Sequence, residues 1–386
     1  MPASEREAVE LVRSAIAAGE SVRAGGGGHS FTPVCLTDGL LCESRGLAGV
    51  VGVDRERRRV QALPGTTVAA FGDRLWADGL ALANQGDIDT QQIAGAVATG
   101  THGSGIALGS FSSTLRGARL VTGTGDVIEI GEDRPDLLRA AQVSVGMLGL
   151  MLELEIEVAP AYRLRERIEN RPYAEVMAEW DLLVASHRHF SFFWLPSERS
   201  AELYGIAVPE GVEMTDTCYV KLYDEAADAE ADDATPGRRI DRGYRIYPSV
   251  FEPNFHELEY FVPIAQGKQA VGAMRELMLA RLPDSVFPME VRTTAGDEAY
   301  LSSNHGGATT VISVSGVPGT DYWPYLREVD ELLGGFGARV HWGKLHFLTR
   351  DQLAARYPES ERFIAIRREL DPRGVFLNDH LRELFA

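Results

Sequence analysis

Four consecutive glycines stand directly before a histidine in the stretch RAGGGGHSFTPV, residues 23–34. Without side chains, successive backbone N–H groups can point into one concavity, and such nests bind phosphate groups without needing positive side chains. The segment lacks the Gly-Lys-Ser/Thr ending of a Walker A loop and the GxGxxG spacing of a nicotinamide-binding turn. The glycines therefore indicate either a phosphate-binding loop or a structural turn.

His29 ends this glycine loop, where it could be a surface residue, a metal ligand or a nucleophile. No second and third ligand are spaced near it, so we predict no metal site. A neutral imidazole is a competent nucleophile near physiological pH. A second stretch of small residues, NQGDIDTQQIAGAVATGTHGSG at 84–105, contains His102, which alone is typical of a structural histidine. Two such loops favour an extended cofactor that carries phosphate.

Side chains that could act on a substrate lie in the second half of the chain. Glu290 and Arg292, two residues apart in MEVRT, project to one face if the segment is a strand. They could present an acid and a fixed cation to one ligand, although the residues alone favour a surface ion pair. His341 and Lys344 lie close together in VHWGKLH. A lysine in a cleft can steady an alkoxide, but most lysines are solvated.

The elements that must position these residues differ between the two parts of the chain. Residues 5–19 have the apolar spacing of a helix, and short β-branched runs follow up to a long alternating strand that ends at Pro160. Residues 161–335 contain longer runs with aromatic residues, strands in FPMEVRTTAG and TTVISVSG, and a helix in VGAMRELMLARL. The last fifty residues end in two short helices. This pattern predicts two domains with a site between them.

Composition limits the partners and the compartment. The net charge of −18 argues against a nucleic-acid partner, since phosphate binding depends on Lys and Arg. Cys35, Cys42 and Cys218 form neither an even disulfide framework nor a metal-ligand spacing, which favours a reducing compartment. Neither a signal peptide nor a run of ~18 apolar residues is found. We predict a soluble cytoplasmic protein, monomeric or a small homo-oligomer, with no membrane partner.

Together the motifs resemble the vanillyl-alcohol-oxidase type of flavoprotein, in its sugar branch of aldonolactone oxidases and alditol oxidases. The similarity runs over nearly the whole chain, in the order GGGGHS, QQIAGAVATGTHGSG, SVGMLGL, FHELEYFVP, MEVRTTAGDEAYLS, and HWGKLH followed by RYPESERFIAIRRELDPRGVFLNDHL. It implies an α+β fold of two domains. Residues 1–160 would form an FAD-binding domain of two α/β subdomains. Residues 161–340 would form an α+β substrate-binding cap domain with a large antiparallel sheet, and residues 341–386 would return to the FAD domain.

The same resemblance implies a cofactor site. The glycines would cradle the pyrophosphate of FAD, and His29 would be bonded covalently to the 8α-methyl group of the isoalloxazine ring. The implied cofactor-binding residues are Gly25, Gly26, Gly27, Gly28, His29, Ser30, Gly86, Gly100, Thr101, His102, Gly103, Ser104 and His341.

The resemblance also assigns Glu290, Arg292 and Lys344 as catalytic residues. A hydride would pass from a CH–OH carbon to flavin N5, while Lys344 and Glu290 help to remove the hydroxyl proton and Arg292 stabilises negative charge on the reduced flavin. Gln92 and Ser315 would bind the substrate. Alditol oxidases have a serine at the position of Gln92, whereas some lactone-acting relatives have a glutamine.

The implied function is that of an FAD-dependent oxidase for a CH–OH group of a polyhydroxylated, sugar-type substrate, with O2 reduced to H2O2. An aldonolactone such as L-gulono- or D-arabinono-1,4-lactone comes first and an alditol second. Gly86 sits where plant-type lactone dehydrogenases carry an alanine thought to exclude oxygen, which favours an oxidase. The alternatives are a dehydrogenase with another acceptor, an oxidase of another sugar-bearing alcohol such as a nucleoside, and a flavin carrier or sensor without turnover.

Overall fold

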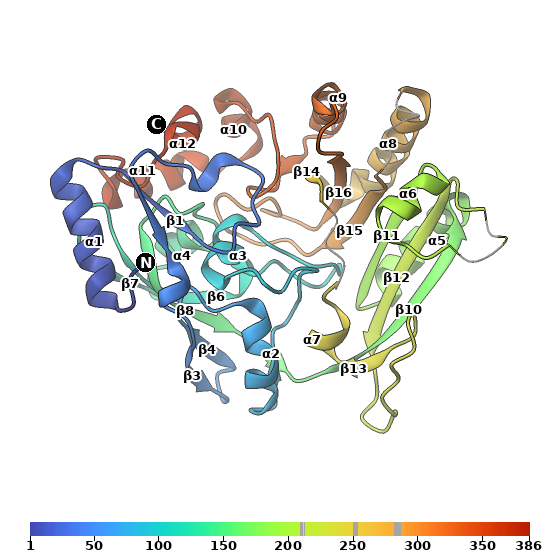
Figure 1. The fold of residues 1–386 in the computed structure, drawn as a ribbon, viewed down its shortest axis with the longest axis horizontal. Coiled ribbons are helices and arrows are strands. Elements are labelled where there is room, and N and C mark those ends of the chain that lie inside the picture. Colours follow the sequence, from blue (N-terminus) through green and yellow to red (C-terminus); the bar gives the residue numbers. More distant parts are fainter. Residues whose placement is uncertain (209–210, 212, 250–253, 282–286) are drawn as a thin grey trace.

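Two antiparallel sheets carry most of the strands in the computed structural model, which describes residues 1–208, 211, 213–249, 254–281 and 287–386 (Figure 1). The smaller sheet has five strands in the order β3-β4-β8-β6-β7. These strands are β3 (Val50–Asp54), β4 (Arg59–Ala62), β6 (Leu115–Val121), β7 (Val127–Ile130) and β8 (Leu150–Glu157). In β8 the leucines and Ile156 are buried while the three glutamates are partly exposed, as expected for a strand with one face on the core.

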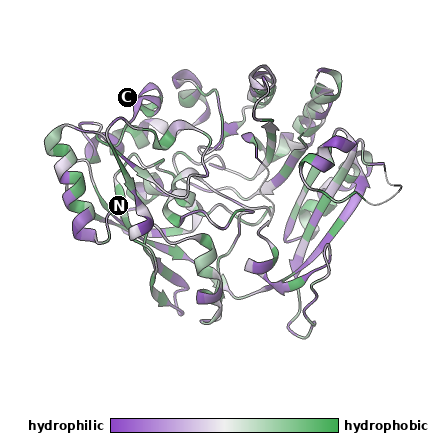
Figure 2. Cartoon of the chain, in the orientation of Figure 1, coloured by the Kyte–Doolittle hydropathy of each residue, from purple (hydrophilic) through white to green (hydrophobic). Residues whose placement is uncertain are grey.

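Helices and short strands complete this first part of the molecule. The helix α1 (Glu5–Ala18) begins at Ser4, whose Oγ accepts a hydrogen bond from the Glu7 amide, and ends at Gly19 in the left-handed conformation. Both hydrophobic and hydrophilic residues are seen along α1 in Figure 2, and its apolar residues pack against the five-stranded sheet. The remaining elements here are β1 (Val22–Gly25) parallel to β2 (Leu40–Glu43), α2 (Val68–Trp76), α3 (Ile93–Thr99), α4 (Pro135–Gln142), and the pair β5 (Leu80–Ala81) and β9 (Ala159–Pro160).

The helix α3 was not predicted from the sequence. Its segment IAGAVAT consists of small and β-branched residues, among them a glycine, which is a poor helix former. The helix begins directly after Gln92 and ends at Gly100, which has a φ of 80°. A short helix, with Ile93, Ala96 and Val97 buried, therefore lies within the second of the two loops that the sequence singles out.

The larger sheet has eight strands in the order β13-β10-β12-β11-β15-β16-β14-β17, which confirms the predicted large antiparallel sheet. Its strands are β10 (Arg163–Pro172), β11 (His189–Leu195), β12 (Thr217–Glu225), β13 (Ile240–Arg242), β14 (His256–Pro263), β15 (Met289–Thr294), β16 (Thr309–Gly316) and β17 (Arg339–Val340). The helices α5 (Tyr173–Ser186), α8 (Gly267–Arg281) and α9 (Trp323–Gly334) pack against it. The shorter helices α6 (Glu198–Leu203) and α7 (Gly243–Ile246) lie between strands.

The register of the central strands brings polar residues into rows. Glu290 of β15 lies opposite Ser313 of β16, and Ser313 lies opposite Glu259 of β14. Glu257 and Ser315 form the next pair on the same face, because alternate residues of a strand share a face. This face is therefore polar at the centre of the sheet.

The C-terminal helices α10 (Arg350–Arg356), α11 (Ser360–Leu370) and α12 (Asp379–Phe385) lie on the side of the molecule that holds the N-terminal elements (Figure 1). The Val22 amide donates to the carbonyl of Val375 at 2.8 Å, so the two ends of the chain are joined at β1. The division into domains at residues 160 and 340 stays a prediction. Among the described residues, no helix has the length and apolar content needed to span a bilayer.

Candidate active site

A cavity opens where β1 runs into the glycine loop, and we call it the glycine cavity. It encloses about 1050 Å³ of empty space, a volume that includes its open mouth. A Cβ atom at Gly26 would lie 3.3 Å from Oε1 of Gln92, and one at Gly27 would lie 3.0 Å from Cδ2 of His29. Side chains at these positions would crowd the cavity wall. Among the predicted residues, those lining it are Gly25, Gly26, Gly27, Gly28, His29, Ser30, Gln92 and Thr101.

Buried polar atoms without partners line the same cavity. The Oε1 atoms of Gln91 and Gln92 are buried and have no hydrogen-bond partner among the described residues, although both side chains line the cavity. A buried polar atom without a partner costs about 1–3 kcal/mol. Such atoms indicate that a polar ligand completes the site.

Arg23 supplies a buried positive charge to the wall of the glycine cavity. Its guanidinium donates to the carbonyls of Val34 at 2.8 Å, Val145 at 2.7 Å and Gly146 at 3.2 Å, and to the carbonyl of Phe376. Burial lowers the pKa of Arg23 to about 10, so the group stays charged at neutral pH. A bare glycine backbone, unpaired buried oxygens and a buried cation fit a cofactor with phosphate groups, such as FAD.

The segment after the glycines is bound to the segment that carries Lys344. The Phe31 amide donates to the Gly343 carbonyl at 2.7 Å, and Thr32 Oγ1 donates to the Trp342 carbonyl at 3.1 Å. Lys344 Nζ lies 5.1 Å from the centroid of the Phe31 ring. Two motifs more than three hundred residues apart in sequence are thus neighbours in the structure. His29 itself is half-buried, and its Nε2 lies 3.1 Å from Thr90 Oγ1.

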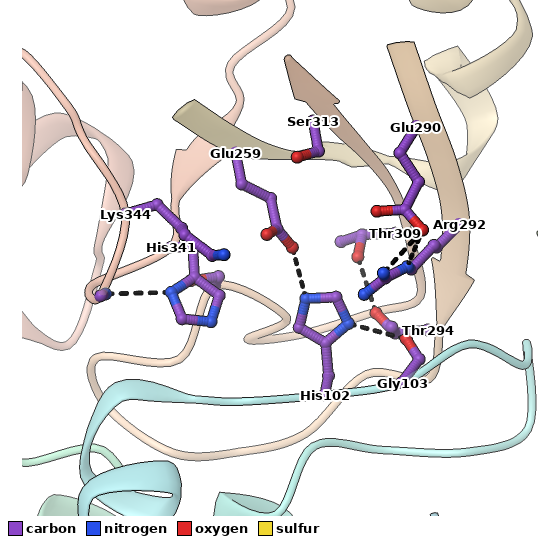
Figure 3. Close-up of polar contacts among 12 residues, drawn as sticks. His102, Gly103, Glu259, Glu290, Arg292, Thr294, Thr309, Ser313, His341 and Lys344 are labelled. Atoms are coloured by element: carbon purple, nitrogen blue, oxygen red, sulfur yellow. Dashed lines mark hydrogen bonds and ion pairs between the residues drawn. The ribbon is translucent and has the colours of Figure 1, made fainter. Parts of the chain in front are cut away.

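Charged residues cover the central strands of the large sheet beside this junction (Figure 3). We call Glu257, Glu259, Glu290, Arg292, Ser313 and Lys344, with the adjoining Asp87, His102 and Lys221, the sheet-face cluster. Its arrangement places carboxylates and cations in contact on one face of the sheet.

Arg292 lies between two carboxylates of this cluster. Its Nε and Nη2 donate to Glu290 Oε1 at 2.9 and 2.6 Å. Nη2 also contacts the carboxylate of Asp87. The other oxygen of Asp87, Oδ1, lies 3.4 Å from Lys221 Nζ. Burial raises the pKa of Glu290 to about 7 against the opposing effect of Arg292, while the charges of Asp87 and Glu257 add to the rise. The Glu290 carboxyl therefore gains and loses its proton near neutral pH.

His102 and Glu259 form a buried pair at the centre of the cluster. Both ring nitrogens of His102 face acceptors: Nδ1 lies 2.8 Å from the Gly103 carbonyl and Nε2 lies 2.6 Å from Glu259 Oε1 (Figure 3). Burial acts to raise the pKa of Glu259, but the charge of His102 and its hydrogen bond outweigh burial, so this pKa lies well below the ordinary range. The carboxylate of Glu259 is therefore ionised.

His341 is neutral and lies beside the sheet-face cluster. Its Nδ1 accepts a hydrogen bond from the Gly343 amide at 2.9 Å, which leaves the ring proton on Nε2. Burial lowers the pKa of His341 to about 3, and the positive charges of His102 and Lys344 act in the same direction.

Other predicted residues lie close to one of the two regions. A Cβ atom at Gly86 would lie 3.5 Å from Thr101 Cγ2 and 3.8 Å from the His102 carbonyl oxygen. A Cβ atom at Gly103 would lie 1.9 Å from the Gln85 carbonyl oxygen, so only glycine fits there. Ser104 Oγ accepts a hydrogen bond from the Tyr247 hydroxyl at 2.9 Å.

The two predicted substrate-binding residues lie in different regions. Ser315 is half-buried and lies opposite Glu257 on the sheet face. Gln92 lies against the glycine loop in the glycine cavity, and no contact joins it to the sheet-face cluster among the described residues.

Sequence reasoning missed Asp87, Lys221, Glu257, Glu259 and Ser313. A signal was present for two of them, because Glu257 and Glu259 alternate with apolar residues in HELEYFVP. Period-two spacing places both carboxylates on one face of a strand that is otherwise buried. The other three lie on separate segments, and only the tertiary fold brings them to the site.

Comparison with known proteins agrees with this geometry. Residues 1–131 match the FAD binding domain family, and residues 154–225 and 208–384 match the D-arabinono-1,4-lactone oxidase family. The chain is 32% identical to an L-gulono-1,4-lactone dehydrogenase of Mycobacterium tuberculosis, over all of this chain and 95% of that protein. It is 31% identical to an alditol oxidase of Streptomyces sp., over 99% of this chain and 94% of that protein.

A solved structure has the same fold. The cholesterol oxidase of Brevibacterium sterolicum superimposes with a TM-score of 0.85 at 14% identity, over the whole of this chain and 93% of that one. This likeness confirms the predicted vanillyl-alcohol-oxidase-type fold. With one family model over the glycine cavity and another over the sheet-face cluster, the chain belongs to the D-arabinono-1,4-lactone oxidase family of FAD-dependent oxidoreductases.

Proposed function

We propose that this enzyme holds FAD through a covalent bond to His29 and oxidises a CH–OH group of an aldonolactone. The hydrogen bonds between residues 31–32 and 342–343 carry this proposal, because they hold the segment after the glycines next to the segment of Lys344. The names of the relatives support the substrate class: D-arabinono-1,4-lactone for the family and L-gulono-1,4-lactone for a protein 32% identical. An alditol is the second candidate, supported by the alditol oxidase that is 31% identical.

The glycine cavity would hold the cofactor. The backbone of residues 25–28 and the side chains of Gln91 and Gln92 would contact its polar groups, and Arg23 would oppose the negative charge of its phosphates. When bound, FAD supplies a two-electron oxidant that takes a hydride from the substrate carbon. The loop that follows Gly28 would carry His29 to the edge of the flavin ring.

Glu290 would accept the proton of the substrate hydroxyl as the hydride leaves. Its pKa of about 7 makes it a competent base at neutral pH, and Arg292 keeps one oxygen of its carboxylate fixed. Lys344 would donate a hydrogen bond to the same substrate oxygen, and Arg292 would hold a fixed positive charge beside the reacting groups. Ser313 and Ser315 offer hydroxyl groups on the same face for the remaining hydroxyls of a sugar.

Oxygen is the electron acceptor that we propose, with H2O2 as its product. Glycine at position 86 supports this choice, since a side chain there would add a carbon in contact with Thr101, 3.5 Å from its Cγ2. A dehydrogenase with another acceptor is the second candidate, because the Mycobacterium tuberculosis relative is named a dehydrogenase.

One experiment tests substrate and acceptor together. The purified flavoprotein is mixed without air with aldonolactones, alditols, free sugars and nucleosides, and the flavin absorbance is followed. We expect an aldonolactone to bleach it fastest and air to restore the colour quickly. Colour that returns only with an artificial dye would support the dehydrogenase, and bleaching by nucleosides alone would overturn the proposed substrate class.

A further inference from the structure

Glu257 uses both carboxylate oxygens within the sheet-face cluster. Its Oε2 is in direct contact with Lys344 Nζ, and its Oε1 accepts a hydrogen bond from Ser313 Oγ. The side chain is 9% exposed, so water competes little for these contacts. Ser313 in turn lies opposite Glu290 in the neighbouring strand. Glu257 therefore links the lysine to the row that contains Glu290.

The main chain sets Glu257 and Lys344 side by side. The segment 341–345 follows β14: the His341 amide donates to the Glu259 carbonyl at 3.0 Å and the Leu345 amide donates to the Glu257 carbonyl at 2.8 Å. Leu258 and Leu345 form a parallel bridge between the two segments. These bonds do not involve the Glu257 carboxylate. A glutamine at this position would therefore keep these main-chain bonds, while it removes the negative charge and replaces one acceptor oxygen by an NH2 group.

Lysine is a rare residue in this chain, yet it occurs in the sheet-face cluster. Of the 38 Lys and Arg residues, three are lysines, at positions 221, 268 and 344, and 35 are arginines. Two of the three lysines belong to the sheet-face cluster. Lysine presents a compact charge with three donors, but it loses its proton readily when buried, unlike arginine. A lysine in this site therefore needs an anion to remain charged.

Charged and titratable groups from several elements surround Lys344. Glu257 and Glu259 face it from β14, Arg292 from β15, and His341 from its own segment, while the Phe31 ring lies 5.1 Å away. Burial acts to lower the pKa of Lys344, but the charges of Glu257 and Glu259 and the hydrogen bond to Glu257 outweigh burial and raise it. The nearest of these charges is that of Glu257.

We propose that Glu257 is a positioning residue that keeps Lys344 as an ammonium group, so that Lys344 donates hydrogen bonds to the substrate oxygen and takes no proton from it. Proton removal then falls to Glu290. The inference rests on the proposed function for its catalytic meaning, but the state of Lys344 is measured without substrate.

Competitive acetylation of the FAD-loaded enzyme with acetic anhydride across a pH series tests this inference. Mass spectrometry of lysine peptides gives a labelling midpoint for each of the three lysines. In Glu257→Gln we expect the Lys344 midpoint to fall by about 1–3 pH units, as for loss of an opposite charge in contact. Lys221, which pairs with Asp87, serves as an internal reference and keeps its midpoint.

Glu225→Gln is the matched control. Glu225 also lies in a strand of the large sheet and pairs with Arg188 at 2.7 Å, but its side chain is 58% exposed. An unchanged Lys344 midpoint in Glu257→Gln, or an equal fall in Glu225→Gln, overturns the inference. If Glu257→Gln does not fold, the labelling midpoints of the wild-type enzyme test the inference instead. A midpoint of Lys344 below that of the exposed Lys268 would overturn the inference.

Kinetics separate this inference from the proposed function. If a substrate bleaches the flavin, its bleaching rate is measured across a pH series. In Glu257→Gln the alkaline limb of this profile should shift to lower pH, together with the labelling midpoint of Lys344. A shifted midpoint with no substrate found would contradict the proposed function alone. Bleaching with an unmoved alkaline limb would contradict the inference alone.

Discussion

The glycine cavity and the sheet-face cluster are neighbours, yet they are built in opposite ways. The cavity presents main-chain atoms and open space, with Arg23 as its buried charge. The cluster presents four carboxylates, Asp87, Glu257, Glu259 and Glu290, in contact with arginine, lysine or histidine side chains. Under the proposed function, the first region recognises a ligand by shape and backbone, while the second uses its side chains to move protons. Substitutions should therefore act through volume in the cavity and through charge in the cluster.

The largest effect is expected from Glu290→Gln, which removes the base without changing volume. Loss of a general base costs roughly 10²–10⁴-fold in rate, and here the rate is that of anaerobic flavin reduction. In the wild type this rate should rise with pH through about 7, since the carboxylate is the active form and its pKa is about 7. That rise should be absent in the variant. A retained rise at the same pH would assign it to another group.

Lys344→Met tests the cation of the cluster and should have the next largest effect. Removing one donor from a developing negative charge costs roughly 10²–10³-fold in rate. The bound flavin should keep its absorbance, because Lys344 does not line the glycine cavity. Loss of flavin together with activity would show that the two regions are not separable.

A smaller effect is expected from His29→Ala, on the other side of the comparison. The flavin should remain bound in the native protein but separate from it on acid precipitation, whereas the wild-type pellet stays yellow. The fold should lose only about 1 kcal/mol, because the ring makes one hydrogen bond, to Thr90, among the described residues. His187→Ala is the matched control, since His187 pairs with Asp224 far from the cavity in sequence and should leave the pellet yellow. A yellow pellet in His29→Ala would contradict the covalent assignment.

The smallest effect should follow Gly86→Ala. Gly86 lies between the two regions, beside Thr101 of the glycine cavity and His102 of the sheet-face cluster. The added methyl group meets its neighbours at 3.5–3.8 Å, an ordinary contact distance, so folding and flavin reduction should be unchanged. Reoxidation by oxygen should slow severalfold in stopped-flow measurements. Gly307→Ala, where nothing lies within 4 Å of the added atom, controls for the substitution itself. An unchanged oxygen rate would remove the main support for an oxidase.

The sequence predicted the two regions unequally, for physical reasons. The glycine loop is local, so its spacing alone indicates a binding nest, and FAD followed from the family resemblance. Glu290 and Arg292 were placed on one face by their spacing, but the residues alone favoured a surface pair. In fact Glu290 is buried and Arg292 half-buried, on a strand that lies between β11 and β16.

Contacts between residues distant in sequence could not be predicted from the sequence. Asp87 contacts Arg292 across 205 residues, and His102 contacts Glu259 across 157. Such pairs depend on sheet register and on how the two parts of the molecule meet, which no local pattern encodes. The resemblance supplied the proposed catalytic residues but not the carboxylates of Asp87 and Glu257 that contact Arg292 and Lys344.

The junction at β1 also has a consequence for biosynthesis. The strand that leads into the glycine loop is held by Val375 and Phe376, and the loop itself by Gly343. A ribosome must therefore synthesise residues 375 and 376 before this loop can take its final shape. Domains generally fold in the order of synthesis, but here the glycine cavity waits for a segment made about three hundred and fifty residues later. Flavin loading should thus follow the synthesis of that segment.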